Sequence, residues 1–146
     1  MIDTVARKKA AEVARHFASG QITNFEFENN MPSTKDSAIW AIEDTIWCFY
    51  DDFKEHKIND NWEVPSEIKA MMARWLMFLY SNEEYLWPKI SYPGIRPIEY
   101  GFFGKLFKKH KKQQAFLNAG NYSVWPFINQ ESYENAKINP VLLACS

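Results

Sequence analysis

Hydrophobic side chains recur every three or four residues over three long stretches of the chain, which is the spacing of an amphipathic helix. The first stretch covers residues 2–19, and Gly20 suits the position just beyond a helix end. Its apolar face is formed by Ile2, Val5, Ala6, Ala10, Val13 and Phe17. The pattern predicts a helix that buries this face and places its charged side chains, Arg7 among them, on the other faces.

The second stretch covers residues 34–53. Ser33 followed by Asp36 is typical of a helix start with an acidic first turn. The face expected in the core consists of Ile39, Ile42, Ile46, Phe49, Tyr50 and Phe53. The sequence predicts a second helix that ends near Phe53 and is followed by a polar, turn-prone connection.

The third stretch, residues 65–81, is apolar on nearly all sides. We expect a helix that starts at Pro65 and lies buried at the centre of the fold. Arg74 falls within it, and a buried guanidinium needs a carboxylate or carbonyl partner. We therefore predict a structural ion pair or a hydrogen-bond clamp at Arg74. The candidate partners are Glu83, Glu84 and the region of Asp44.

The remaining segments are less regular. Residues 21–30 alternate weakly and predict a short strand or an extended loop, whereas the prolines and Gly94 within residues 88–97 predict loops. Helical spacing returns over residues 102–118 and 130–137. The predicted fold class is mainly α: the whole chain forms one compact helical bundle, with an irregular proline- and aromatic-rich C-terminal half and at most a short β-hairpin.

Composition fits this prediction. The 146 residues are 47% hydrophobic and 24% charged, as in an ordinary folded domain, and the 16% aromatic content supplies a core and leaves rings for a surface. No apolar run reaches the roughly 20 residues of a membrane span, and the first residues lack the apolar centre of a secretory signal. Two cysteines, Cys48 and Cys145, are too few for a disulfide scaffold. We therefore expect a cytoplasmic protein.

Motifs for catalysis and metal binding are absent from the sequence. The histidines and cysteines lack the close pairs of a zinc site, and the glycines form neither a phosphate-binding loop nor a dinucleotide motif. We therefore predict no catalytic residue, no metal and no cofactor. An alternative hypothesis, an enzyme, uses the cluster of Asp51, Asp52, Glu55 and His56, because carboxylates beside a histidine suit a general base or a cation site. The same cluster also fits a solvated helix end.

Charge is distributed unevenly along the chain, although the net charge is only −1. Residues 36–67 contain nine acidic and two basic side chains, whereas residues 89–112 contain seven basic and one acidic side chain. The electrostatic field of such a charged segment accelerates association with a partner of opposite charge. The layout therefore favours a protein that binds a charged partner.

The acidic region carries two tryptophans on one side of the predicted helix 34–53, about 100–140° from the core face at 100° per residue. This stripe consists of Trp40, Glu43, Asp44, Trp47, Asp51 and Asp52. Tryptophan is a frequent anchor of protein interfaces, and neighbouring carboxylates supply register and steering. We predict that these six residues bind a protein partner. The alternative is that both tryptophans only widen the buried face.

The basic region offers another function. Its candidate anion-binding residues are Lys105, Lys108, Lys109 and Lys112. Lysines neutralise phosphates, but residues 104–113 contain no arginine to read bases with a bidentate fork. The segment therefore predicts either nucleic-acid binding or a solvated helix face, and protein binding stays the preferred hypothesis.

Two segments resemble a known family. Residues 74–88 read RWLMFLYSNEEYLWP and residues 125–128 read WPFI. They are similar to segments of small bacterial immunity proteins from polymorphic and contact-dependent growth-inhibition toxin systems. The segments are rich in aromatic residues, which is typical of packing, so no catalytic residue follows from the resemblance.

The resemblance implies a cytoplasmic protein without a cofactor whose partner is a cognate toxin domain, neutralised by stoichiometric occlusion. Nuclease toxins have basic clefts because they bind phosphates, so an acidic aromatic face suits a nuclease. The resemblance leaves the partner's identity and the oligomeric state open.

Overall fold

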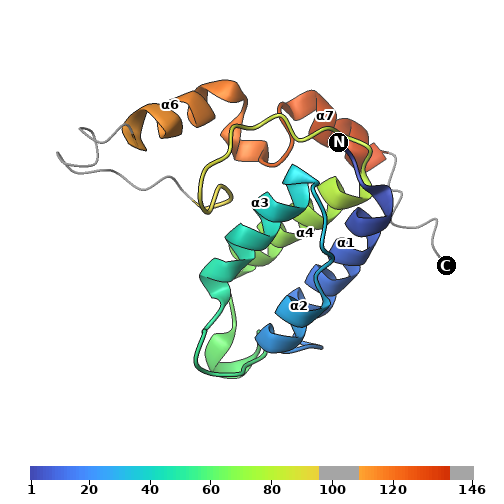
Figure 1. Ribbon diagram of the computed structural model, residues 1–146, viewed down its shortest axis with the longest axis vertical. Helices are drawn as coiled ribbons and strands as arrows, with labels where there is room; N and C mark the ends of the chain where they lie inside the picture. The colour runs from blue at the N-terminus through green and yellow to red at the C-terminus, as the bar shows by residue number, and fades with distance from the viewer. Residues whose placement is uncertain (96–108, 139–146) are drawn as a thin grey trace.

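The computed structural model describes residues 1–95 and 109–138, and within these ranges it consists of helices and connections without a strand (Figure 1). The α-helices are α1 (Thr4–Ala18), α2 (Asn24–Asn30), α3 (Ser37–Ile46), α4 (Ser66–Tyr80), α6 (Lys109–Ala119) and α7 (Gln130–Ile138). The short 3-10 helices are η1 (Trp47–Phe49), η2 (Asp60–Trp62) and η3 (Tyr122–Val124). The predicted mainly α fold is confirmed.

The N-terminal helices pack around α4. The expectation that this helix is buried on nearly all sides is wrong, because Glu67, Lys69 and Ala73 are exposed and the burial is confined to one face. α1 and α3 both contact α4, and α2 contacts α1. Figure 1 shows α6 and α7 lying across one end of this group, and α7 contacts α4. Trp75 and Phe78 of α4 are each 1% exposed, and α1 meets this helix with small buried side chains that permit a close approach. These small side chains are Ala6, Ala10, Ala11 and Ala14.

Helix ends explain one difference from the sequence prediction. Residues 21–30 were expected to be extended, yet most of them form α2. Thr23 accepts a hydrogen bond from the N–H of Glu26, and the Glu26 carboxylate accepts one from the N–H of Thr23. This reciprocal capping box satisfies two N–H groups at the start of α2 and favours a helix over an extended segment. Gly20 ends the preceding region with φ +69°, as predicted for a residue beyond a helix end.

The helix predicted over residues 34–53 is shorter than expected. Asp36 caps its start by accepting the N–H of Ala38, and α3 gives way to the 3-10 helix η1 after Ile46. Tyr50 is already extended, and Phe53 is 98% exposed. The expectation that Phe53 lies in the core is therefore wrong. Acidic residues beyond Tyr50 disfavour a longer helix, because carboxylates oppose the dipole at a helix C-terminus.

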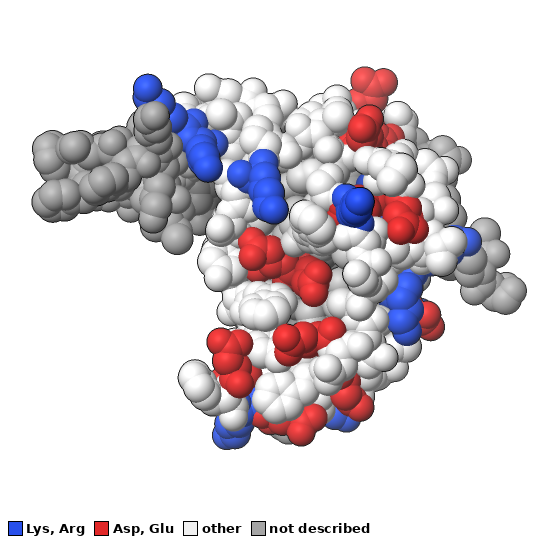
Figure 2. Space-filling model, in the orientation of Figure 1, with Lys and Arg blue, Asp and Glu red and all other residues white. Residues whose placement is uncertain are grey.

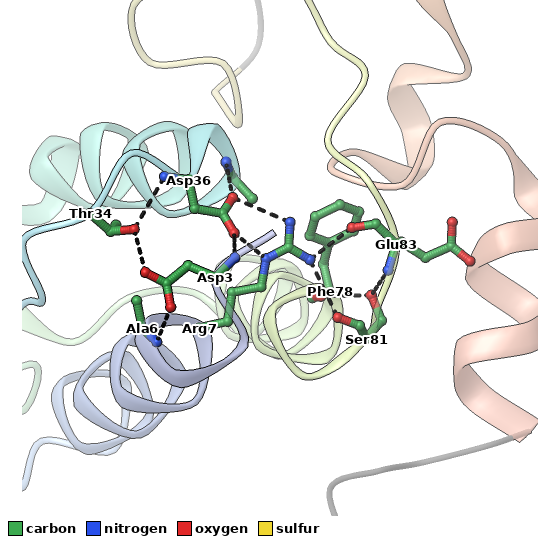
Figure 3. A network of polar contacts seen from close by, with 9 residues as sticks. Asp3, Ala6, Arg7, Thr34, Asp36, Phe78, Ser81 and Glu83 are labelled. Atoms are coloured by element: carbon green, nitrogen blue, oxygen red, sulfur yellow. Dashed lines mark hydrogen bonds and ion pairs between the residues drawn. The ribbon is translucent and has the colours of Figure 1, made fainter. Parts of the chain in front are cut away.

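A buried ion pair joins α1 to the start of α3 (Figure 3). Arg7 is 1% exposed and Asp36 is 2% exposed, and Arg7 Nε donates to Asp36 Oδ2 over 2.7 Å. Asp36 Oδ2 also accepts the N–H of Asp3 at 3.0 Å. The sequence placed Arg7 outside the buried face and Val5 within it. Both expectations are wrong, because α1 turns Arg7 towards the core and leaves Val5 79% exposed.

The same arginine also holds the end of α4. Arg7 Nη1 donates to the carbonyl oxygens of Ser81 at 3.3 Å and Glu83 at 2.7 Å, and its guanidinium lies 5.3 Å from the ring centre of Phe78. Figure 3 shows these contacts converging on one side chain from three parts of the chain. The buried charge is thus paired and hydrogen-bonded, which offsets the cost of removing it from water.

Residues 74–88 and 125–128 pack against each other. Trp87 Nε1 donates to the carbonyl oxygen of Pro126 at 2.9 Å. The rings of Phe78 and Phe127 meet edge to face at 5.0 Å, and those of Trp75 and Trp125 at 5.7 Å. These two segments therefore include much of the contact between α4 and the C-terminal part of the fold.

Replacing Arg7 with methionine tests the ion pair. Arg7→Met keeps an apolar side chain but leaves Asp36 buried without its charged partner, so we expect a loss of about 3–5 kcal/mol in the free energy of unfolding. Arg15→Met, on the exposed side of the same helix, is the matched control and should change it by less than about 0.5 kcal/mol. Urea unfolding measures both; equal losses would show that the pair is not what stabilises the fold.

The pH dependence of stability gives a second test. Burial alone would raise the pKa of Asp36, but hydrogen bonds from Arg7 and from the N–H groups of Asp3 and Ala38 outweigh it and hold the pKa below its usual value of 3.8. Such a carboxylate stabilises the folded state above its usual pKa and loses this contribution as the pH falls through its folded pKa.

We therefore expect the free energy of unfolding to decrease below about pH 4. Asp36→Asn should lower stability at neutral pH and flatten the acid limb of the profile. Urea unfolding over this pH range measures the effect, and parallel profiles for the two proteins would contradict the assignment.

Candidate protein-binding face

Four of the six predicted partner-binding residues lie together on the outer side of α3. We call this the α3 face, and it consists of Trp40, Glu43, Asp44 and Trp47. Trp40 is 46% exposed and Trp47 is 38% exposed, so each ring is partly covered by the fold and partly presented to solvent. Figure 2 shows acidic side chains gathered over α3 and the part of the molecule beyond its C-terminal end. Aromatic and acidic side chains therefore share one surface.

The neighbouring helix α2 extends this surface. The Tyr50 hydroxyl donates to Glu28 Oε2 at 2.7 Å, and the rings of Trp47 and Tyr50 stack with their centres 5.3 Å apart. Burial and the adjacent Glu28 carboxylate raise the pKa of Tyr50 to about 12, so the phenol stays protonated and keeps donating. The sequence prediction missed Glu28 and Tyr50, because it treated α2 as extended and placed Tyr50 in the core.

The carboxylates of the two helices repel one another. Burial is the largest cause that raises the pKa of Glu43, and the negative charges of Glu28 and Asp44 raise it further. Partly buried carboxylates with these neighbours gain from a positive charge placed beside them. The electrostatics of the α3 face thus favour a cationic partner.

The chain itself places a cation on this surface. Lys89 Nζ lies 4.9 Å from the ring centre of Trp40. Further along the same segment, the N–H of Tyr92 donates to Asp44 Oδ2, and the N–H of Gly94 donates to Thr45 Oγ1. Asp44 therefore fixes a neighbouring segment, while the Trp40 ring shows that the face accommodates an ammonium group.

The two remaining predicted residues lie in the loop that follows η1. Asp51 Oδ1 accepts the N–H groups of Phe53 at 2.8 Å and Lys54 at 3.0 Å, so this carboxylate orders its own loop. Asp52 is exposed. Of the two, Asp52 is the one whose side chain is presented to solvent.

The alternative catalytic cluster is divided among structural contacts. His56 is 6% exposed, accepts the N–H of Asp51 at Nε2, and stacks on Trp62 with ring centres 4.0 Å apart. Glu55 accepts the hydroxyl of Thr23 at 2.8 Å. Among residues 1–95 and 109–138, no group of three or more histidine, cysteine, aspartate or glutamate side chains is arranged to hold a metal ion. These polar groups serve the packing of the loop.

Arg74 takes a carbonyl partner. Its Nε donates to the backbone oxygen of Trp125 at 2.7 Å, and burial lowers the pKa of its guanidinium. In the described part of the chain Arg74 forms no ion pair, so the expected carboxylate partners, Glu83, Glu84 and the Asp44 region, are wrong. The hydrogen-bond clamp is the form that the structure shows.

The basic region is described only in part. Lys105 and Lys108 lie outside the described residues, as does the side chain of Lys109, at the start of α6. Lys112 is exposed on α6. Cys48 is exposed, and Cys145 lies outside the described residues. The helices of the described chain include none that is long and apolar enough to cross a membrane.

Comparison with known proteins adds no relative. No family model matches the chain, and neither the curated proteins nor the solved structures contain a match. The similarity of residues 74–88 and 125–128 to immunity proteins therefore stays a prediction. The functional argument rests on the geometry of the α3 face.

Glu43→Gln tests the electrostatics of this face. A carboxylate with a raised pKa destabilises the fold above its folded pKa, and the cost vanishes below its usual pKa. We therefore expect Glu43→Gln to be more stable than the wild type at neutral pH and equally stable near about pH 3. Glu12→Gln, at an exposed position on α1, is the control. Urea unfolding at both pH values measures the difference, and a destabilised Glu43→Gln at neutral pH would contradict the repulsion.

Proposed function

We propose that this protein is a cytoplasmic, immunity-type inhibitor that neutralises a toxin domain by occluding it in a stoichiometric complex. The α3 face, with Asp52 beside it, forms the contact surface. The observation that carries the proposal is the exposure of Trp40, on α3, and of Trp47, directly after it, beside Glu43 and Asp44 of the same helix. An exposed indole costs hydration free energy in the isolated protein, and a partner that covers it recovers that cost.

Tryptophan side chains and nearby carboxylates contribute differently to a protein interface. Desolvated aromatic anchors supply most of the affinity, whereas charges set the rate of encounter and the register. Trp40 and Trp47 are one full heptad apart, so both rings are available to one partner surface. A standard interface of about 1,200–2,000 Å² in total extends beyond these two rings and includes neighbouring groups such as Asp52.

The charge of the face indicates the charge of the partner. Residues 36–67 are strongly acidic. The negative charges of Glu28 and Asp44 lie close enough to Glu43 to raise its pKa, in addition to the effect of burial. A basic cleft complements this arrangement, and nucleases have such clefts because they bind phosphates. The resemblance of residues 74–88 to immunity proteins supports the same partner class.

The proposal expects the gene adjacent to this one to encode the toxin domain, and that domain serves as the binding partner in the test. Isothermal titration should give a 1:1 complex, and the complex should lack the toxin's activity. Trp40→Ala combined with Trp47→Ala should raise the Kd by at least about 30-fold, because each anchor is worth about 1 kcal/mol or more. Unchanged affinity of this double variant would show that another surface binds.

Reversing the charge of Asp52 tests whether the acidic residues of the proposed contact surface govern the association rate. Asp52→Lys should lower the association rate by about tenfold at low salt, with a smaller effect at high salt. Glu12→Lys makes the same change in net charge on α1 and should leave the rate close to that of the wild type. Stopped-flow kinetics measures both. Equal effects of the two variants would mean that net charge, and not the face, governs association.

A further inference from the structure

Phe53 is the most exposed of the large hydrophobic side chains in the described chain. It is 98% exposed and lies between the exposed side chains of Asp52 and Lys54. A phenylalanine in this position contributes nothing to the core. A single exposed hydrophobic side chain is common on protein surfaces, so the significance of Phe53 depends on what holds its loop and what lies beside it.

Hydrogen bonds from buried side chains fix the backbone on both sides of Phe53. Asn24, which is fully buried, donates from Nδ2 to the carbonyl oxygens of Asp51 at 2.8 Å and Lys54 at 3.1 Å, and its Oδ1 accepts the N–H of His56 at 2.8 Å. His56 Nε2 accepts the N–H of Asp51 at 3.2 Å. The Asp51 carboxylate closes the turn on the N–H groups of Phe53 and Lys54. The exposure of Phe53 is therefore a property of an ordered loop.

An ordered loop makes an exposed ring an effective anchor. The backbone entropy is lost on folding, so binding needs to fix only the two torsions of the side chain. Aromatic residues give a large contact area for this small entropic cost. Phe53 thus has the two properties of a preorganised anchor, namely full accessibility and a fixed attachment.

The loop is continuous with the α3 face. It follows η1 directly, and Tyr50, at the junction, stacks on Trp47 and hydrogen-bonds Glu28. A partner that covers Trp47 therefore lies next to the loop, and a basic group on that partner is complementary to Asp52. This continuity and the charge of the face identify the occupant as the partner of the α3 face.

We propose that Phe53 is a further anchor of the same interface, inserted into an apolar pocket beside the basic cleft of the toxin domain. This inference rests on the proposed function, because it assigns Phe53 to the partner that the α3 face binds. The hydrogen bonds of Asn24, Asp51 and His56 hold the loop in its binding conformation before the partner arrives.

The first experiment compares Phe53→Ala with the wild type in titrations with the toxin domain that the proposed function expects from the adjacent gene. We expect the Kd to rise about 10- to 100-fold, mostly through faster dissociation, with no change in Tm. Val5→Ala is the matched control, because Val5 is 79% exposed on α1, outside the interface. Wild-type affinity of Phe53→Ala would overturn the proposal.

The outcomes distinguish this proposal from the function on which it rests. If the Trp40→Ala and Trp47→Ala double variant loses affinity and Phe53→Ala does not, Phe53 is no anchor and the proposed function stands. If the wild type does not bind the toxin domain, the proposed function fails and the inference fails with it. A homodimer in sedimentation velocity that Phe53→Ala dissolves would also overturn the proposal, since the ring would then contact a second copy of the chain.

The second experiment tests preorganisation without any partner. Amide hydrogen exchange in the free protein should show protection of the Phe53 and Lys54 N–H groups, which donate to the Asp51 carboxylate. Asp51→Ala should remove this protection and weaken toxin binding, whereas Asp52→Ala should preserve the protection. Exchange at the rate of an unstructured peptide in the wild type would overturn the fixed-loop part of the proposal.

Discussion

The arrangement of the helices depends on one buried ion pair, between Arg7 and Asp36. Removing both charges from water is costly, and the cost is offset only because the guanidinium also reaches the carbonyl oxygens of Ser81 and Glu83, while Asp36 accepts backbone N–H groups. These partners belong to the start of α3 and the segment after α4. The pair therefore fixes both helices relative to α1, and a displaced helix would leave a buried charge unpaired.

The position of α3 in turn decides what the surface displays. Once Asp36 caps this helix beside Arg7, its apolar side chains Ile39, Ile42 and Ile46 face the core. The opposite side carries the α3 face, where Trp40 and Trp47 are partly exposed and Asp44 binds the segment that contains Tyr92. Burial, together with the charges of Glu28 and Asp44, raises the pKa of Glu43, so the charged form of this carboxylate is a cost to the folded protein. The core side of α3 thus contributes to stability, and its outer side carries the proposed contact surface.

In the loop after η1, buried residues that stabilise the fold and exposed residues proposed to bind the partner also lie close together. Asn24 and His56 are buried and form hydrogen bonds with backbone groups of the loop. The loop is therefore ordered while the Phe53 side chain is exposed to solvent. The polar cluster that suggested general-base chemistry from the sequence is therefore part of this support. Residues that are adjacent in the sequence here have separate tasks, because the turn buries His56 and leaves the side chains of residues 52–55 exposed.

Helical periodicity is a local property of the chain, and the mainly α fold and the outward side of α3 could therefore be predicted from it. The tertiary structure alone decided the partner of Arg7, the carbonyl partner of Arg74 and the exposure of Phe53. Arg7 and Asp36 are 29 residues apart, and Arg74 and Trp125 are 51 apart. Which groups meet over such separations depends on how the helices pack, and no local pattern of hydrophobic and polar residues records it.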